Sequence, residues 1–270
     1  MLYMELANYR LHYCQYGSGP PVLFLHGLSF DSRMWSPQYS FFEDEFMALG
    51  LDFRGHGFSD APDIDYSLDT YVADVSALLK SLHLPSVVLV GLSLGGAVAM
   101  DFTLRYPQRV NALVLASSAL NGHNWSSAWQ EVMRRVRTAD SIQAQKINLR
   151  EYWFKDPMFE GIRYRTEYSQ LLKSMAAAFS GKPIMYGDLQ SKTYSGNSNT
   201  FREITCPVCV INGEEDRSDF KQIARKLASD IHRVEWHQLP DVGHMVNMEA
   251  PDEFNKIVQS FLYRVEAEGI

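Results

Sequence analysis

The run from Val87 to Ala99 constrains the fold of this chain more than any other stretch. It begins with apolar, largely β-branched residues, passes through GLSLGG and continues with small helix-forming residues. The pattern predicts a buried strand, a sharp turn and a helix. Gly91 and Gly95 lie two residues either side of Ser93, where small neighbours permit a turn that lifts the serine hydroxyl above the sheet edge. The N–H groups that begin the helix would face this hydroxyl and could stabilise an anion there.

Strand and helix patterns alternate through most of the chain. A helix that begins after Ser67, a good N-cap residue, precedes the strand that leads to Ser93. The alternation predicts an α/β fold with a mostly parallel central sheet, flanked by helices on both faces. Strands are expected at 11–16, 22–25, 47–51, 112–116, 208–212 and 234–239, and helices at 68–82, 97–106, 219–228 and 251–263, besides the strand at 87–90.

The alternation stops between about residues 121 and 200. This stretch has no clear strand pattern, is rich in large aromatic residues, carries basic helix-like runs and ends in the polar loop 195–199. We expect residues 1–120 and 201–270 to form the α/β core. Residues 121–200 are expected to form a helical cap, or lid, inserted into it.

Composition limits the partners of the chain. Its 25 Lys and Arg against 32 Asp and Glu give a formal net charge of -7, which argues against nucleic acid or an anionic membrane as partner. We therefore expect a small-molecule partner, while the oligomeric state stays undetermined. The sequence contains no secretory signal pattern and no apolar run long enough to cross a bilayer. Three cysteines in 270 residues favour a reducing, cytoplasmic location.

A serine hydroxyl becomes a good nucleophile only when a base is within hydrogen-bond reach and an acid orients that base. His244 lies just after the last predicted strand, and Asp216 lies just after the strand before it. In a parallel sheet these loops open at the same edge as the turn at Ser93. Ser93, Asp216 and His244 are therefore the predicted catalytic residues, in the order serine, acid, histidine.

Five motifs in this order resemble the α/β-hydrolase superfamily, in particular its small capped serine ester hydrolases. The resemblance covers nearly the whole chain except the predicted cap. It implies a serine hydrolase without a cofactor, in which the backbone N–H groups of Leu28 and Leu94 form an oxyanion hole; for Leu94 the position at a helix N-terminus agrees. The motifs are His26-Gly27-Leu28, the loop 52–60, Gly91 to Gly96, Gly213 to Asp216, and Gly243-His244 followed by Glu249-Ala250-Pro251.

The chain departs from this family at one place. Family members usually carry a proline a few residues after the acid, whereas this chain has Arg217, Ser218, Asp219 and Phe220 there. The departure leaves Glu215 or Asp219 open as an alternative to Asp216 as the acid.

The predicted reaction is hydrolysis of carboxylic esters or lactones through an acyl-enzyme. Carbon–carbon bond hydrolysis of ring-cleavage products is an alternative, although those relatives usually place tryptophan after the histidine, where this chain has Met245. Acyl transfer to an alcohol and perhydrolysis need the same acyl-enzyme. A ligand sensor that retains the triad is an alternative of another class. Serine rather than aspartate at position 93 argues against epoxide hydrolase and haloalkane dehalogenase activity.

Four apolar residues are candidates for the substrate pocket: Trp125, Trp129, Trp153 and Met245. The aromatic residues of the predicted cap suggest a substrate with an apolar or ring-bearing part. The arginines of the cap are expected to form a solvated helix face, or alternatively to bind a substrate carboxylate. His26 and His56 are interpreted as packed structural histidines rather than catalytic ones, and the Cys206 and Cys209 pair as buried packing. No metal site is expected, because the other histidines show no pairing at metal-ligand spacing: His12, His83, His123, His232 and His237.

Overall fold

The computed structural model describes residues 1–63, 65–164, 167–187 and 198–269. In this part of the chain, eight strands form one sheet in the order β1-β2-β4-β3-β5-β6-β7-β8. β2 pairs antiparallel with both β1 and β4, and all other neighbours pair parallel, so the prediction of a mostly parallel sheet is confirmed. The strands are β1 (Leu2–Glu5), β2 (Arg10–Tyr16), β3 (Pro21–Leu25), β4 (Met47–Leu51), β5 (Val87–Leu92), β6 (Val110–Ala116), β7 (Val208–Gly213) and β8 (Val234–Leu239).

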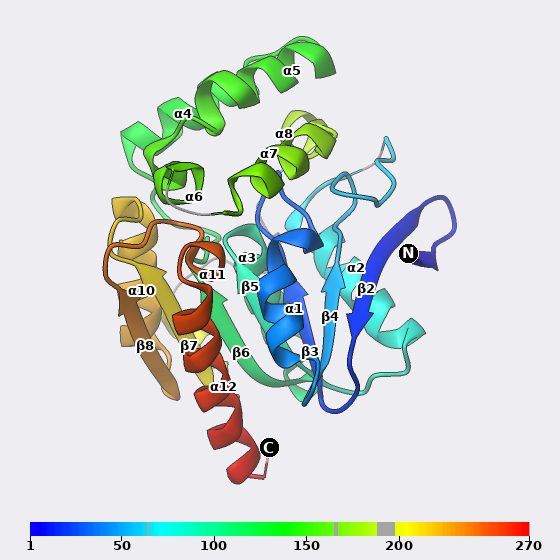
Figure 1. Ribbon diagram of the computed structural model, residues 1–270, viewed down its shortest axis with the longest axis vertical. Coiled ribbons are helices and arrows are strands. Elements are labelled where there is room, and N and C mark those ends of the chain that lie inside the picture. The colour runs from blue at the N-terminus through cyan, green and yellow to red at the C-terminus, as the bar shows by residue number, and fades with distance from the viewer. Residues whose placement is uncertain (64, 165–166, 188–197, 270) are drawn as a thin grey trace.

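Helices cover both faces of this sheet (Figure 1). α1 and α12 contact each other in front of it in this view, while α2, which contacts α3, lies behind it. The apolar positions of α2 face the core, as their helical spacing predicts. Ser67 is the N-cap of α2, but its hydroxyl donates to Asp65 instead of accepting from the helix, which corrects its expected capping role. The flanking helices are α1 (Ser36–Phe42), α2 (Leu68–Ser81), α3 (Leu94–Arg105), α10 (Ser218–Asp230), α11 (Val246–Glu249) and α12 (Pro251–Ala267).

Between β6 and β7 the described residues form helices and no strand. In Figure 1 the first five of these helices lie together at one end of the sheet. The expected loop at 195–199 lies largely outside the described residues, since only its last two positions are described, at the start of α9. The helices are α4 (Ser127–Arg137), α5 (Ile142–Asn148), α6 (Glu160–Tyr164), α7 (Ser169–Ala178), α8 (Lys182–Tyr186) and α9 (Ser198–Phe201), with short turns of other helical type at Leu149–Trp153 and Pro157–Phe159.

Strands at the centre of the sheet provide the core. Every residue of β5 and of β7 is buried, whereas β1, at the edge, is largely exposed. β1 was not predicted from the sequence, because its alternating pattern covers only four residues and half of them are exposed. No helix in the described part of the chain combines the length and apolar character needed to span a membrane.

The turn between β5 and α3 has the strain that its glycines predict. Ser93 has a φ of 53° and a ψ of -112°, outside the regions that a serine usually adopts. A Cβ on Gly91 would lie 2.3 Å from the carbonyl oxygen of Gly95, and one on Gly95 would lie 2.0 Å from that of Leu25. Backbone atoms of three neighbouring segments thus leave no room for side chains around Ser93.

We expect Gly95→Ala to destabilise the fold, although alanine in a helix normally stabilises by about 1 kcal/mol over glycine. The added methyl group meets a strand backbone that cannot move without breaking the sheet, so the free energy of unfolding should fall by roughly 1–3 kcal/mol. Urea denaturation measures the change.

Gly27→Ala is the matched control, because its Cβ would meet a movable side-chain atom, Cδ2 of Leu92, at 3.2 Å. It should cost less than Gly95→Ala. Equal costs, or a stabilised Gly95→Ala variant, would contradict the steric account of the turn.

Candidate active site

Ser93 opens onto a cavity of about 460 Å³ between the carboxyl end of β5 and helix α4. The serine is partly exposed there, while the residues on either side of it in the sequence are buried. The cavity is also lined by Leu28, Leu94, Ala97, Ala119, Leu120, Asn121, Gly122, His123, Trp125, Trp129, Gln130, Met133, Arg134, Arg137, Trp153 and Phe220.

His244 and Asp216 form a buried pair in the loops after β8 and β7. The Nδ1–H of His244 lies 3.0 Å from Oδ2 and 3.1 Å from Oδ1 of Asp216, and both residues are almost fully buried. Oδ1 also accepts from the backbone N–H of Arg217 at 2.7 Å. With its proton on Nδ1 held by the carboxylate, the imidazole presents Nε2 as a base.

Phe220 links this pair to the cavity of Ser93. Its ring centroid lies 4.3 Å from that of His244, and the same side chain lines the cavity. Among the described residues, hydrogen bonds join His244 to Asp216 but none joins His244 to Ser93. The approach of His244 to the serine hydroxyl therefore stays a prediction.

The two alternatives to Asp216 make other contacts. Glu215 is exposed, and Asp219 accepts from the backbone N–H and the hydroxyl of Ser126, both at 2.7 Å. Arg217 donates from Nε and one Nη to Asp156 at 2.9 and 2.8 Å. Arg217 and Asp219, near the expected proline position, therefore bond to residues between β6 and β7, and the hydrogen bonds between His244 and Asp216 favour Asp216 as the acid.

Glu249 holds the loop of His244 from both sides. Its carboxylate accepts from the N–H of Gly243 at 2.9 Å and from that of Met245 at 3.0 Å, and the N–H of His244 donates to the carbonyl of Met158 at 3.2 Å. Burial raises the pKa of Glu249, and the two N–H donors oppose that rise. The backbone on both sides of the imidazole is therefore fixed by one acid.

Met245 corrects an expectation. It is fully buried and is absent from the residues that line the cavity. The chain turns inward after His244 to begin α11 at Val246, which carries the Met245 side chain into the core instead of towards the cavity.

The two expected oxyanion donors lie at the cavity. Leu94 is the first residue of α3, where an N–H has no partner within the helix. Leu28 lies in the loop after β3. Among the described residues neither N–H donates a hydrogen bond, and both residues line the cavity with Ser93.

The three tryptophans named as pocket candidates lie together in the lining of the cavity, as one wall. Trp125 stacks on Trp129 with centroids 4.9 Å apart, and Trp153 meets Trp129 edge to face at 5.6 Å. The indole N–H of Trp153 donates to the hydroxyl of Ser29 at 2.8 Å. This bond ties the wall to the loop of Leu28.

His26 is a packed histidine, as the sequence predicts. Its Nε2 accepts from the N–H of Phe53 at 3.0 Å and its Nδ1–H donates to the carbonyl of Gly27 at 2.8 Å. Burial lowers the pKa of His26, and it lowers that of His56 strongly. Both rings are therefore neutral supports of their loops.

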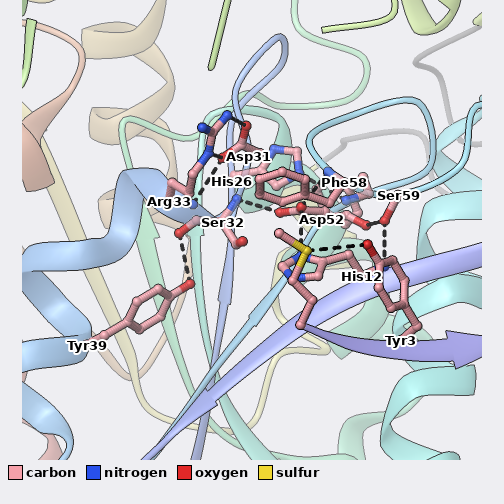
Figure 2. A network of polar contacts seen from close by, with 12 residues as sticks. Tyr3, His12, His26, Asp31, Ser32, Arg33, Tyr39, Asp52, Phe58 and Ser59 are labelled. Atoms are coloured by element: carbon pink, nitrogen blue, oxygen red, sulfur yellow. Dashed lines mark hydrogen bonds and ion pairs between the residues drawn. The ribbon is translucent and has the colours of Figure 1, made fainter. Parts of the chain in front are cut away.

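A second buried acid–histidine pair forms between His12 and Asp52 (Figure 2). Asp52 accepts from Nδ1 of His12 at 2.9 Å and from the N–H groups of Ser32 and Phe58 at 2.7 and 2.9 Å. Burial alone would raise the pKa of Asp52, but these hydrogen bonds and nearby His26 outweigh it and lower the pKa to about 2. The pair joins β2, β4 and the loop after β3.

In the part of the chain that the structure describes, one cluster of metal-ligand type was not predicted from the sequence. Ligand atoms of Cys209, Glu235 and His237 lie within 4.8 Å of one another. Cys209 and Glu235 are partners across β7 and β8, a register that the sequence does not reveal. We assign no metal there, because Arg264 already pairs with Glu235 at 2.6 Å and burial raises the pKa of the Cys209 thiol.

Comparison with known proteins gives concordant matches. A family model described as alpha/beta hydrolase fold matches residues 20–251. A Bacillus subtilis protein named as a 2-succinyl-6-hydroxy-2,4-cyclohexadiene-1-carboxylate synthase is 31% identical over 255 residues, covering 89% of each chain. An Acinetobacter baylyi protein named 3-oxoadipate enol-lactonase 2 is 26% identical, covering 97% of this chain and 96% of its own. A solved structure of an N-acyl homoserine lactone degrading enzyme is 29% identical, with a TM-score of 0.77, covering 96% of this chain and all of its own.

From the contacts of Asp52 we predict that the free energy of unfolding falls in acid. Because the pKa of Asp52 is lowered to about 2 from its ordinary 3.8, its contribution is present above about pH 4 and is lost as the pH falls through 2. Asp52→Asn should lower the free energy of unfolding by about 2 kcal/mol at pH 6 and flatten its fall between pH 4 and 2.

Urea denaturation at several pH values tests this, with Asp44→Asn, at an exposed acid, as control. The control should keep the wild-type pH dependence. An Asp52→Asn variant with the wild-type slope in acid would contradict the assignment.

Proposed function

This chain belongs to the alpha/beta hydrolase fold family, and from that membership we propose that it is a serine hydrolase of carboxylic esters or lactones. One observation carries the proposal. Ser93 opens onto the same cavity as Leu28 and Leu94, while Nδ1 of His244 lies 3.0 Å from a carboxylate oxygen of Asp216, which would hold the proton on Nδ1. A nucleophile, unpaired N–H donors and an oriented base are what acyl transfer requires.

The reaction begins when Nε2 of His244 accepts the proton of the Ser93 hydroxyl. The oxygen of Ser93 then forms a bond to the acyl carbon, and the carbonyl electrons move onto oxygen. The N–H groups of Leu28 and Leu94 stabilise this oxyanion, each donor typically contributing about 3–4 kcal/mol to catalysis. His244 returns the proton to the leaving alkoxide as the carbon–oxygen bond breaks, which leaves the acyl-enzyme.

Water completes the cycle. His244 takes a proton from water as the water oxygen attacks the acyl-enzyme, and returns it to Ser93 as the acid leaves. Asp216 stays ionised and stabilises the imidazolium in both halves. In this proposal the helical segment 121–200 acts as the lid that covers the cavity, and the reaction needs no cofactor.

The wall of tryptophans favours a substrate with an apolar or ring-bearing part, since aromatic side chains contribute much of the binding energy in such pockets. Two of the relatives described above are named for lactone chemistry, an enol-lactonase and an N-acyl homoserine lactone degrading enzyme. This supports the inclusion of lactones beside open-chain esters.

Ser93→Ala tests the proposal against the alternative that the protein is a ligand sensor that retains the triad residues. Turnover of p-nitrophenyl acetate should fall by roughly 10⁴-fold or more, because the nucleophile of the covalent step is removed. Release of p-nitrophenol measures it, with Ser229→Ala, at an exposed serine of α10, as control. Equal rates in Ser93→Ala and wild type would reject the catalytic assignment.

Asp216→Asn tests whether Asp216, rather than a neighbouring acid in the sequence, orients the imidazole of His244. Without the carboxylate, the imidazole loses its preferred tautomer, and kcat should fall by about 10⁴-fold. Glu215→Gln changes the adjacent, exposed acid and should leave kcat within about twofold. The reverse result, with activity dependent on Glu215, would assign the acid role to that residue and contradict the structure-based choice.

A further inference from the structure

One side of helix α4 faces the candidate active-site cavity. Gln130, Met133, Arg134 and Arg137 line the cavity, and their spacing of three, four and seven residues places them on one face of the helix. Trp129 precedes them and belongs to the aromatic wall. The wall therefore continues along α4 into a basic end.

The charges at this end are of one sign. Among the described residues that line the cavity, both formally charged side chains are arginines and none is a carboxylate, although the chain as a whole carries a formal charge of -7. A basic lining on an acidic protein concentrates positive potential in the cavity, where it attracts anions.

The two arginines differ in how their charge is compensated. Arg134 donates to both carboxylate oxygens of Glu131, at 2.7 and 2.8 Å. The side chain of Arg137 has no ion pair or hydrogen bond to any residue that the structure describes. Arg137 is therefore the lining cation that is free to bind an external anion.

We propose that Arg137 binds a carboxylate on the substrate, so that the preferred substrates are esters or lactones with an anionic group at the end remote from the bond that is cleaved. The ester part rests on the function proposed above. A guanidinium suits this role because its planar N–H groups match the two oxygens of a carboxylate.

The length of α4 sets the size of such a substrate. From Trp129 to Arg137 the helix rises about 12 Å, at about 1.5 Å per residue. An apolar chain along the tryptophans can thus place its terminal carboxylate at Arg137, which a short acid such as acetate cannot do. A half-ester of a medium-length dicarboxylic acid fits this description.

The kinetic test compares the p-nitrophenyl half-ester of suberic acid with its neutral methyl ester. Wild type should prefer the anion, and Arg137→Gln should raise KM for the anion by about three- to tenfold, with KM for the neutral ester within about twofold, as expected for one exposed charged contact. The preference should shrink as salt is added.

Arg135→Gln is the matched control. It removes the same charge from the same helix, but Arg135 pairs with Glu131, lies over the ring of Tyr152 and does not line the cavity. It should leave both KM values unchanged. Equal effects of the two variants, or no preference for the anion in wild type, would overturn the proposal.

Binding without turnover separates this inference from the proposed function. In a Ser93→Ala background, suberate should quench the fluorescence of the cavity tryptophans, and Arg137→Gln should weaken its binding by a similar factor. Binding of suberate through Arg137 in a protein that hydrolyses no ester would support the anion site and reject the hydrolase. If the protein hydrolyses the neutral ester but Arg137→Gln leaves suberate binding unchanged, the hydrolase is supported and the anion site is rejected.

Discussion

The close packing of backbone around Ser93 is the constraint on which the rest of the structure depends. The carbonyl of Leu25, at the end of β3, lies where a side chain on Gly95 would point, so β3, β5 and α3 meet with no space between them. This contact holds Ser93 at a positive φ, presents Leu94 as the first N–H of α3 and brings the loop of Leu28 alongside. A single steric arrangement therefore positions the candidate nucleophile and both candidate oxyanion donors.

The loops that carry the candidate catalytic groups also bond to described residues of the segment between β6 and β7. Asp219 and Arg217, beside the acid Asp216, bind Ser126 and Asp156 of that segment. The N–H of His244 donates to Met158. The loops of Asp216 and His244 are therefore bonded directly to residues between β6 and β7.

Much of the α/β core could be predicted from the sequence, because its strands are short apolar runs bounded by turns and its helices carry a clear buried face. β4 and β8 match their predicted ranges, and α2 does so within one residue. Contacts that depend on strand register, or on how side chains of distant segments pack together, could not be predicted. The sequence does not show that Cys209 lies opposite Glu235, or that the Met245 side chain enters the core while Phe220 reaches His244.

The most direct test of the central claim is labelling with a fluorophosphonate, followed by intact-mass measurement and peptide mapping. The account predicts one covalent adduct per chain, on Ser93, formed rapidly in wild type and lost in His244→Ala, because only a hydroxyl with an adjacent base reacts quickly. Labelling of Ser93 at the same rate without His244, or labelling of another serine in its place, would contradict the convergence of the two residues.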